Sequence, residues 1–250
     1  MNIGIDKIFE YLSWNNSDEI QKCGIKLAGN IKNLSVLIMP IESKSIWENC
    51  AKVLVNKSDD ELSLYLINIF EWLKDMNWPG ADLIYDRLLC MSSEKFLPAH
   101  RYSLSVAKQT QDCPWEKALN DLYVEYIFNM IDWSAPARIQ SQGISLANDM
   151  KTIIPFLQPQ TAEYSKNIWA NCATIIFQKD DEILRPHLYK LMEWLKDMNW
   201  PGANTILDRL NRFSDKKELD IVKQQCIISA KDSFDGVWEN NLKKIRTLDL

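Results

Sequence analysis

Apolar residues recur at intervals of three and four along most of the chain, the pattern of helices that bury one face. In the segment 60–74, for example, Leu62, Leu66 and Leu73 follow these intervals behind an acidic first turn. This segment predicts one helix. Pro79 suits the first turn of the next helix, because its fixed φ favours that position and the residue before it is pushed out of helical geometry. We therefore expect a second helix to begin at Pro79.

Loop residues interrupt this periodicity about every 20 positions, and the segments between them are long enough for helices of three to four turns. Runs of alternating apolar and polar residues bounded by hairpin turns, which would predict strands, are lacking. The best strand candidate is 34–39, yet the matching segment 152–157 contains Pro155 and resembles a helix start. The pattern predicts an all-α protein.

The chain also repeats itself. Residues 71–81 return without a single change as residues 193–203, 122 positions later. Trp47, Asn49, Cys50 and Ala51 recur at the same offset, and upstream segments recur at an offset of 119. Self-similarity on this scale indicates a duplicated domain. We expect two homologous halves, residues 1–122 and 123–250.

Each half has room for about three helical hairpins of roughly 40 residues, the size of a HEAT or armadillo unit. Stacked hairpins of this kind predict a HEAT-like α-solenoid. A compact helical bundle in each half is the competing architecture, and the periodicity fits both.

Composition and charge narrow the classes of partner. Hydrophobic residues make up 46% and aromatic residues 10% of the chain, enough for a buried core. The net charge of −5 argues against a nucleic-acid partner, which normally requires a basic face. Up to Leu122 the chain has 17 acidic and 13 basic residues, and beyond it 17 and 16. The first half is thus the more acidic, and a basic partner would meet it more readily.

The six cysteines form neither a CxxC pair nor a short disulfide framework, which favours reduced thiols. Only Cys50 and Cys172 are equivalent between the halves, and we expect both on apolar helix faces. The first residues lack the order of a secretory signal, and no apolar run approaches the ~20 residues of a membrane span. These features predict a cytoplasmic protein with no membrane partner.

The repeated segment supplies the one constellation of polar and aromatic residues that stands out. In the favoured interpretation, the Asp or Asn of the loop caps backbone N–H groups while the tryptophans pack between helices. In the alternative, Asp and Asn bind a ligand and the tryptophans anchor it. The candidate binding residues are Trp72, Asp75, Asn77, Trp78, Trp194, Asp197, Asn199 and Trp200.

All ten tryptophans fall into five pairs between the halves, so a packing role is the default expectation for each of them. The pairs are Trp14/Trp133, Trp47/Trp169, Trp72/Trp194, Trp78/Trp200 and Trp115/Trp238.

Signatures of catalysis are lacking. His100 and His187 occupy non-equivalent positions, and no zinc-ligand spacing, P-loop or GxGxxG motif occurs. Asp75 and Asp82 could be read as an acid–base pair, but a solvated or capping role is favoured. We expect no catalytic residue, no metal site and no cofactor.

The segments 72–79 and 194–201 resemble the W-L-x-D-x-N-W-P signature of a bacterial family of uncharacterised domains, each about 120 residues long. The resemblance covers both halves and implies an α-helical, HEAT-like domain without known catalysis. Both copies depart from the family in one respect, since Gly80 and Gly202 stand where an aliphatic residue is usual. A glycine at the second helical position would permit close approach of a neighbour.

The leading expectation is a non-enzymatic, protein-binding scaffold. Its most specific form is a bacterial immunity or antitoxin protein whose acidic first half faces a basic toxin domain. The alternative is a small-molecule or peptide-binding module, or a cryptic enzyme, with a cleft between the two halves.

Overall fold

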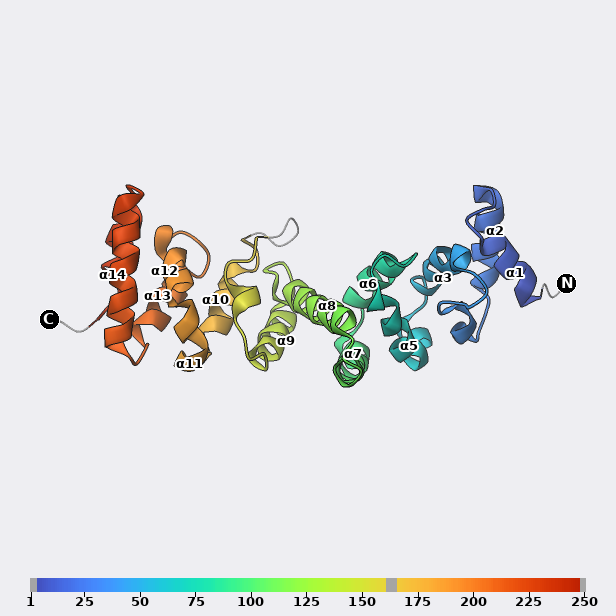
Figure 1. Cartoon of the computed structure of the whole chain (residues 1–250), viewed down its shortest axis with the longest axis horizontal. Helices are drawn as coiled ribbons and strands as arrows, with labels where there is room; N and C mark the ends of the chain where they lie inside the picture. Colours follow the sequence, from blue (N-terminus) through green and yellow to red (C-terminus); the bar gives the residue numbers. More distant parts are fainter. Residues whose placement is uncertain (1–3, 161–165, 248–250) are drawn as a thin grey trace. The chain divides into compact units, whose positions relative to one another are not determined.

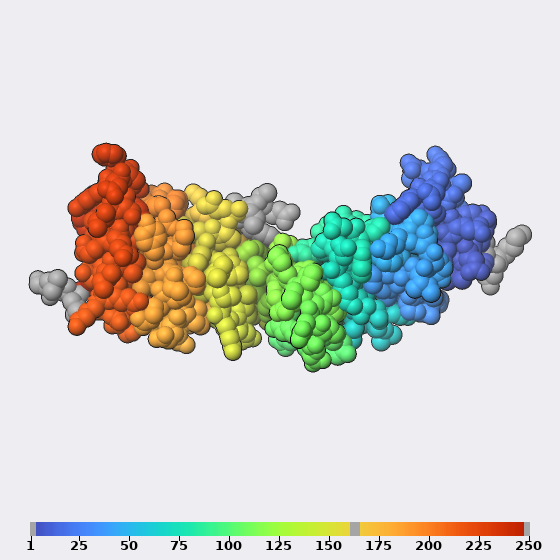
Figure 2. Space-filling model, viewed as in Figure 1, coloured from blue at the N-terminus to red at the C-terminus, as the bar shows by residue number. Residues whose placement is uncertain are grey.

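The computed structural model describes residues 4–160 and 166–247, and the secondary structure within these residues is helical with no strand. The expectation of an all-α protein is confirmed. The chain divides into two compact units, Met1–Glu125 (unit 1) and Tyr126–Leu250 (unit 2). Within each unit successive helices lie beside one another, so the colour changes gradually across the surface (Figures 1 and 2).

Unit 1 begins with a helix pair and continues through alternating short α- and 3₁₀-helices to two long helices. Its elements are α1 (Ile5–Leu12), α2 (Asp18–Ala28), η1 (Leu34–Leu37), η2 (Lys44–Ile46), α3 (Trp47–Leu54), α4 (Asp59–Leu62), η3 (Ser63–Tyr65), α5 (Leu66–Phe70), η4 (Glu71–Lys74), α6 (Ala81–Leu89), α7 (Ser93–Gln109) and the first part of α8 (Cys113–Ile131).

Unit 2 repeats this order, except that η2 has no counterpart among the described residues. Its elements are the last part of α8, then α9 (Ala137–Asn148), η5 (Ile154–Phe156), α10 (Trp169–Phe177), α11 (Asp181–Leu184), η6 (Arg185–His187), α12 (Leu188–Glu193), η7 (Trp194–Lys196), α13 (Ala203–Asn211), α14 (Lys216–Asp232) and α15 (Gly236–Leu242).

Helix α8 joins the two copies. Trp115 in its first part corresponds to Trp238 in α15, and their indole N–H groups donate to equivalent carbonyls. Ile131 at its end corresponds to Leu12 at the end of α1, since each carbonyl accepts from the side-chain amide of the equivalent asparagine. One continuous helix therefore combines the last helix of the first copy with the first helix of the second.

The single helix predicted for 60–74 is instead a series of short segments, α4, η3, α5 and η4. The break after α4 has a local cause. The Ser63 hydroxyl donates to the Asp60 carbonyl at 2.7 Å and so competes with a backbone donor there. In the second copy Pro186 lies one position further along the same turn and lacks an N–H. Different residues thus break the helix at the same place.

The repeated segment ends in a turn, and the predicted start of the helix after this turn is wrong. Helices α6 and α13 begin at Ala81 and Ala203, two residues after the expected start at the proline. The reason is that Gly80 and Gly202 precede these helices with φ of +83° and +84°, in the left-handed region. A left-handed residue ends right-handed geometry, so the helix starts only after it.

The expected close approach at these glycines is confirmed. A Cβ atom on Gly80 would lie 2.5 Å from the Ala51 Cβ on α3, and one on Gly202 would meet Ala173 on α10 in the same way. These turns therefore hold α6 and α13 tightly against α3 and α10.

Candidate functional site: the tryptophan loops and a polar groove

Trp72 and Trp194 lie in the core. Both side chains are fully buried. The Trp72 indole N–H donates to the Pro79 carbonyl at 3.0 Å, and the Trp194 N–H donates to the Pro201 carbonyl at 3.1 Å. Each ring also meets the edge of Trp47 or Trp169, with centroids 6.1 and 6.0 Å apart. These two candidates hold the turn in place from within and do not reach the surface.

Asp75 and Asp197 are engaged by their own loops. The Asp75 carboxylate accepts from the backbone N–H of Asn77 at 2.9 Å and from its side-chain amide at 3.0 Å. Asp197 accepts the same two bonds from Asn199, at 2.8 and 3.0 Å. This is the Asx turn by which a short acidic side chain stabilises a loop. The acceptor therefore caps the loop rather than the first turn of the next helix.

Trp78 and Trp200 lie half-buried at the edge of the same cluster. Trp78 packs edge-on against Trp47 with centroids 5.5 Å apart, and Trp200 packs on Trp169 at 5.6 Å. Lys44 and Lys166 lie over the half-buried rings, each with its ammonium 5.5 Å from the centroid. Of the eight sequence-derived candidates, these tryptophans and the exposed Asn77 and Asn199 are therefore the ones available to another molecule.

In unit 2 the loop opens onto a groove of about 460 Å³. Trp200, Ile154 and Leu157 supply apolar surface, while Gln158, Gln160, Lys190, Glu193 and Lys196 supply polar groups. Trp200 and Lys196 come from the repeated segment, so the groove is built partly from the loop that the sequence singled out.

Glu193 organises the polar side of this groove. Its carboxylate accepts from Lys190 at 2.7 Å and from Lys196 at 2.9 Å. Burial opposes ionisation of Glu193, but the hydrogen bonds and charges of the two lysines outweigh it and hold the pKa below its usual value. The carboxylate is thus ionised and occupied by protein cations.

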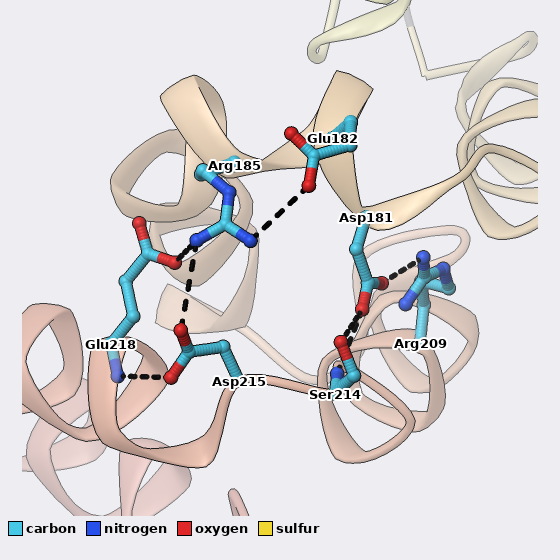
Figure 3. A network of polar contacts seen from close by, with 7 residues as sticks. All are labelled: Asp181, Glu182, Arg185, Arg209, Ser214, Asp215 and Glu218. Carbon is cyan, nitrogen blue, oxygen red and sulfur yellow. Dashed lines mark hydrogen bonds and ion pairs between the residues drawn. The ribbon is translucent and has the colours of Figure 1, made fainter.

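A second polar cluster, which sequence reasoning did not single out, ties α11 to the helices after it (Figure 3). The buried Arg209 donates to the Lys179 carbonyl at 2.8 Å and to the Asp181 carboxylate at 2.5 Å. Asp181 also accepts from the backbone N–H of Ser214 at 2.8 Å. Arg185 lies beside this cluster and pairs with three acidic side chains, Glu182, Asp215 and Glu218 (Figure 3).

Unit 1 repeats the core of this cluster with Arg87, Asp59 and Ser92. A signal was present in the sequence, because Asp86-Arg87-Leu88 recurs as Asp208-Arg209-Leu210. The partner aspartates lie 28 residues away on another helix, however, so the pairing depends on the fold. Every charged group in the cluster has a protein partner, which marks it as structural.

The tryptophan pair Trp14/Trp133 differs from the other four pairs. Trp14 is 47% exposed and Trp133 is 69% exposed, whereas the remaining eight tryptophans are buried or half-buried. Their backbones are nevertheless anchored in the same way, since the N–H groups of Trp14 and Trp133 donate to the carbonyls of Ser45 and Asn167. The default expectation of packing does not describe this pair.

His100 and the two equivalent cysteines, Cys50 and Cys172, are buried. His100 stacks between Phe96 and Tyr123 and bonds through Nε2 to the Leu119 carbonyl at 2.9 Å. Burial lowers the pKa of its imidazole. Cys50 and Cys172 are fully buried on helix faces, as expected, and burial raises the pKa of the Cys50 thiol to about 12. These groups belong to the core.

Neither a metal site nor a membrane span is found in the described residues. In this part of the chain, no three His, Cys, Asp or Glu residues come together as a metal site would require. Likewise, none of the described helices has the length and apolar character needed to cross a bilayer.

The chain matches one protein family. The model of the domain of unknown function DUF5071 matches residues 47–157 and residues 169–247. The chain belongs to the DUF5071 family. The expectation of an uncharacterised domain present in two copies is thereby confirmed. Both DUF5071 matches begin at a paired tryptophan, Trp47 or Trp169, the first residues of α3 and α10. No curated protein and no solved structure matches the chain.

The family's domain and the compact units do not begin at the same residue. The first DUF5071 match continues beyond unit 1, through α9, to Leu157, while residues 1–46 lie outside both matches. Helix α8, which belongs to both copies, lies within the first match.

Proposed function

We propose that this DUF5071 protein is a non-enzymatic, cytoplasmic scaffold of HEAT-like helical-hairpin repeats that binds another protein. The observation that carries the proposal is the pair Trp14 and Trp133, exposed at the same position in each copy. Tryptophan is among the residues most enriched at binding hot spots, because one rigid ring buries a large area at little entropic cost. Backbone anchoring by Ser45 and Asn167 holds both rings ready for such a contact.

The interaction should depend on these two rings. We expect a stoichiometric protein partner to co-purify with the tagged wild-type chain from its own host. Removal of a hot-spot side chain costs about 2 kcal/mol or more, or roughly thirtyfold in affinity. The double variant Trp14→Ala/Trp133→Ala should therefore lose most of the partner at equal protein concentration.

The matched control is Ile221→Ala/Ile228→Ala, which removes two exposed apolar side chains on α14 that have no repeated counterpart. This variant should retain the partner, and all three proteins should melt at similar temperatures. Retention of the partner by the tryptophan variant, or absence of any stoichiometric partner, would contradict the proposal.

The more specific version is an immunity or antitoxin role toward a basic toxin domain. It rests on the acidic excess of the first half, and partners of opposite charge associate faster. An adjacent reading frame that encodes a toxin, together with rescue of toxin-expressing cells by this chain, would support it. Growth arrest that continues in the presence of the chain would contradict it.

The groove in unit 2 favours a second candidate function, a small-molecule or peptide-binding module. The sequence suggested a cleft between the halves for this role, whereas the groove described above lies within unit 2. A cavity of a few hundred Å³ with apolar walls and a few convergent polar groups has the usual character of a ligand site.

A further inference from the structure

Gln158, one of the residues that line the groove in unit 2, has a side-chain atom without a hydrogen-bond partner among the described residues. The side-chain nitrogen of Gln158 is buried, and within the described residues no acceptor meets it. A buried amide N–H that has lost water and gained no acceptor is costly to the folded protein. An acceptor atom supplied by a ligand would remove that cost.

The equivalent position in unit 1 shows that the fold does not require this amide. Met39 corresponds to Gln158, since both adopt left-handed φ, +44° and +47°, one residue before a proline. The carbonyls of those prolines, Pro40 and Pro159, accept from the equivalent indoles of Trp47 and Trp169. The same backbone conformation thus carries an apolar side chain in one copy and an amide donor in the other.

A second position in the groove also differs between the two copies. Lys190, which lines the groove, has the uncharged Asn68 as its counterpart in unit 1. Unit 2 therefore has an amide donor where unit 1 has Met39, and a positive charge where unit 1 has the uncharged Asn68. Glu193 and Lys196, in contrast, are the same in both copies as Glu71 and Lys74.

Donors exceed acceptors around the groove. Each lysine ammonium carries three N–H donors, and Glu193 accepts one bond from Lys190 and one from Lys196. Two lysines and one glutamate leave a net positive charge. Ile154, Leu157 and the half-buried ring of Trp200 add apolar surface to the groove.

We propose that this groove binds a carboxylate attached to an apolar body. The carboxylate accepts hydrogen bonds from the Gln158 amide and the Lys190 ammonium, and the apolar body packs on Trp200, Ile154 and Leu157. The ligand is either a free amphipathic acid or the carboxyl end of a peptide, because both present this chemistry. The site is independent of Trp14 and Trp133 and extends beyond the proposed scaffold function.

The test is a titration of the ¹⁵N-labelled chain with N-acetyl-phenylalanine, followed by NMR. The side-chain amide signals of Gln158 and the indole signal of Trp200 should shift and saturate. The carboxamide of the probe, N-acetyl-phenylalaninamide, should bind at least about tenfold more weakly, because a charge-assisted bond is lost. A short peptide that ends in phenylalanine, with a free or an amidated terminus, distinguishes the two sources. If the peptide with the free terminus binds more tightly than N-acetyl-phenylalanine, the ligand is a chain end. If it binds more weakly, the ligand is a free acid.

The informative variants are those already accepted by the other copy, Gln158→Met and Lys190→Asn. Each variant should bind N-acetyl-phenylalanine about tenfold more weakly than the wild type, as expected for the loss of one hydrogen bond to a charged group. The matched control Lys217→Asn removes an exposed lysine on α14 and should bind as the wild type does.

Three results would overturn the proposed site. The first is the absence of a saturable shift up to about 10 mM N-acetyl-phenylalanine, a concentration above the dissociation constants of weak sites. The second is equal binding of the acid and the carboxamide, and the third is wild-type affinity in the Gln158→Met/Lys190→Asn variant. The two single variants lie on different segments, the loop that follows η5 and helix α12, so misfolding of one leaves the other as a test.

Discussion

At the scale of single residues, two glycines explain why the repeated segment includes Trp-Pro-Gly in both copies. Gly80 and Gly202 combine a left-handed backbone with a contact too close for any side chain. Both requirements exclude other residues for physical reasons, so the glycine is a structural feature of this chain's turn.

Replacement of either glycine should therefore destabilise its unit. We expect Gly80→Ala or Gly202→Ala to lower the free energy of unfolding by about 2–4 kcal/mol, from left-handed strain and overpacking against Ala51 or Ala173. Urea denaturation measures this change. Gly236→Ala is the control, because no atom lies within 4 Å of the new methyl group. A loss as small as that of the control would show that the turn relaxes freely.

Asp59 and Asp181 make the stability depend on acid. Burial raises the pKa of each carboxyl, but the bonds from Ser92 and Arg87, or from Ser214 and Arg209, outweigh it and leave the pKa below the ordinary 3.8. A depressed pKa contributes stability that is complete above the ordinary value and disappears as pH falls through the folded value.

We therefore expect the free energy of unfolding to fall as pH decreases below about 4. Urea denaturation at a series of pH values measures this slope. In the Asp59→Asn/Asp181→Asn variant the protein should be less stable at neutral pH and its stability should change less with acid. An unchanged slope in the variant would show that other groups cause the acid dependence.

At the scale of elements, the Asp-x-Asn-Trp loop is held by its own aspartate. The backbone N–H of Asn77 bonds to Asp75, so the carboxylate stabilises the loop itself. The side chain of Asn77 adds one bond, from its amide to the same carboxylate, and Asn77 is exposed. The two residues therefore have separable roles.

Asp75→Ala should lower stability by about 1 kcal/mol, the usual value of a side-chain to backbone bond in a turn. Asn77→Ala should change stability by less than about 0.5 kcal/mol, as exposed substitutions usually do. Thermal denaturation compares the two variants, and Asp197→Ala and Asn199→Ala repeat the experiment in unit 2. A larger effect of the asparagine would contradict the Asx-turn interpretation.

At the scale of the whole molecule, α8 contains residues of both units. Nearest-neighbour coupling of this kind makes repeat proteins unfold together. We expect one calorimetric transition for the wild type. Val124→Pro, in the middle of α8, removes a helical bond at a cost of about 3 kcal/mol or more and should separate the transition into two. Val124→Ala should retain one transition, and a single transition in the proline variant would show that coupling does not depend on α8.

Much of this organisation could be predicted because it depends on local pattern. Helical periodicity indicated the all-α class, and exact repetition indicated two copies. Errors arose where local rules competed. The 60–74 helix breaks because the Ser63 hydroxyl takes a carbonyl from the helix, and α6 starts late because Gly80 is left-handed. The periodicity of apolar residues in a single sequence does not predict either effect.

The sequence by itself determined the helical class, the duplication, the buried cysteines and the family. The tertiary structure alone decided which tryptophans are buried, which residues pair with Arg87 and Arg209, and where the groove lies. The physical reason is that periodicity and repetition are properties of neighbours along the chain. The burial of these tryptophans, the ion pairs of Arg87 and Arg209 and the position of the groove depend on residues far apart in the sequence that meet only after folding. Identical loops therefore border different surroundings in the two copies.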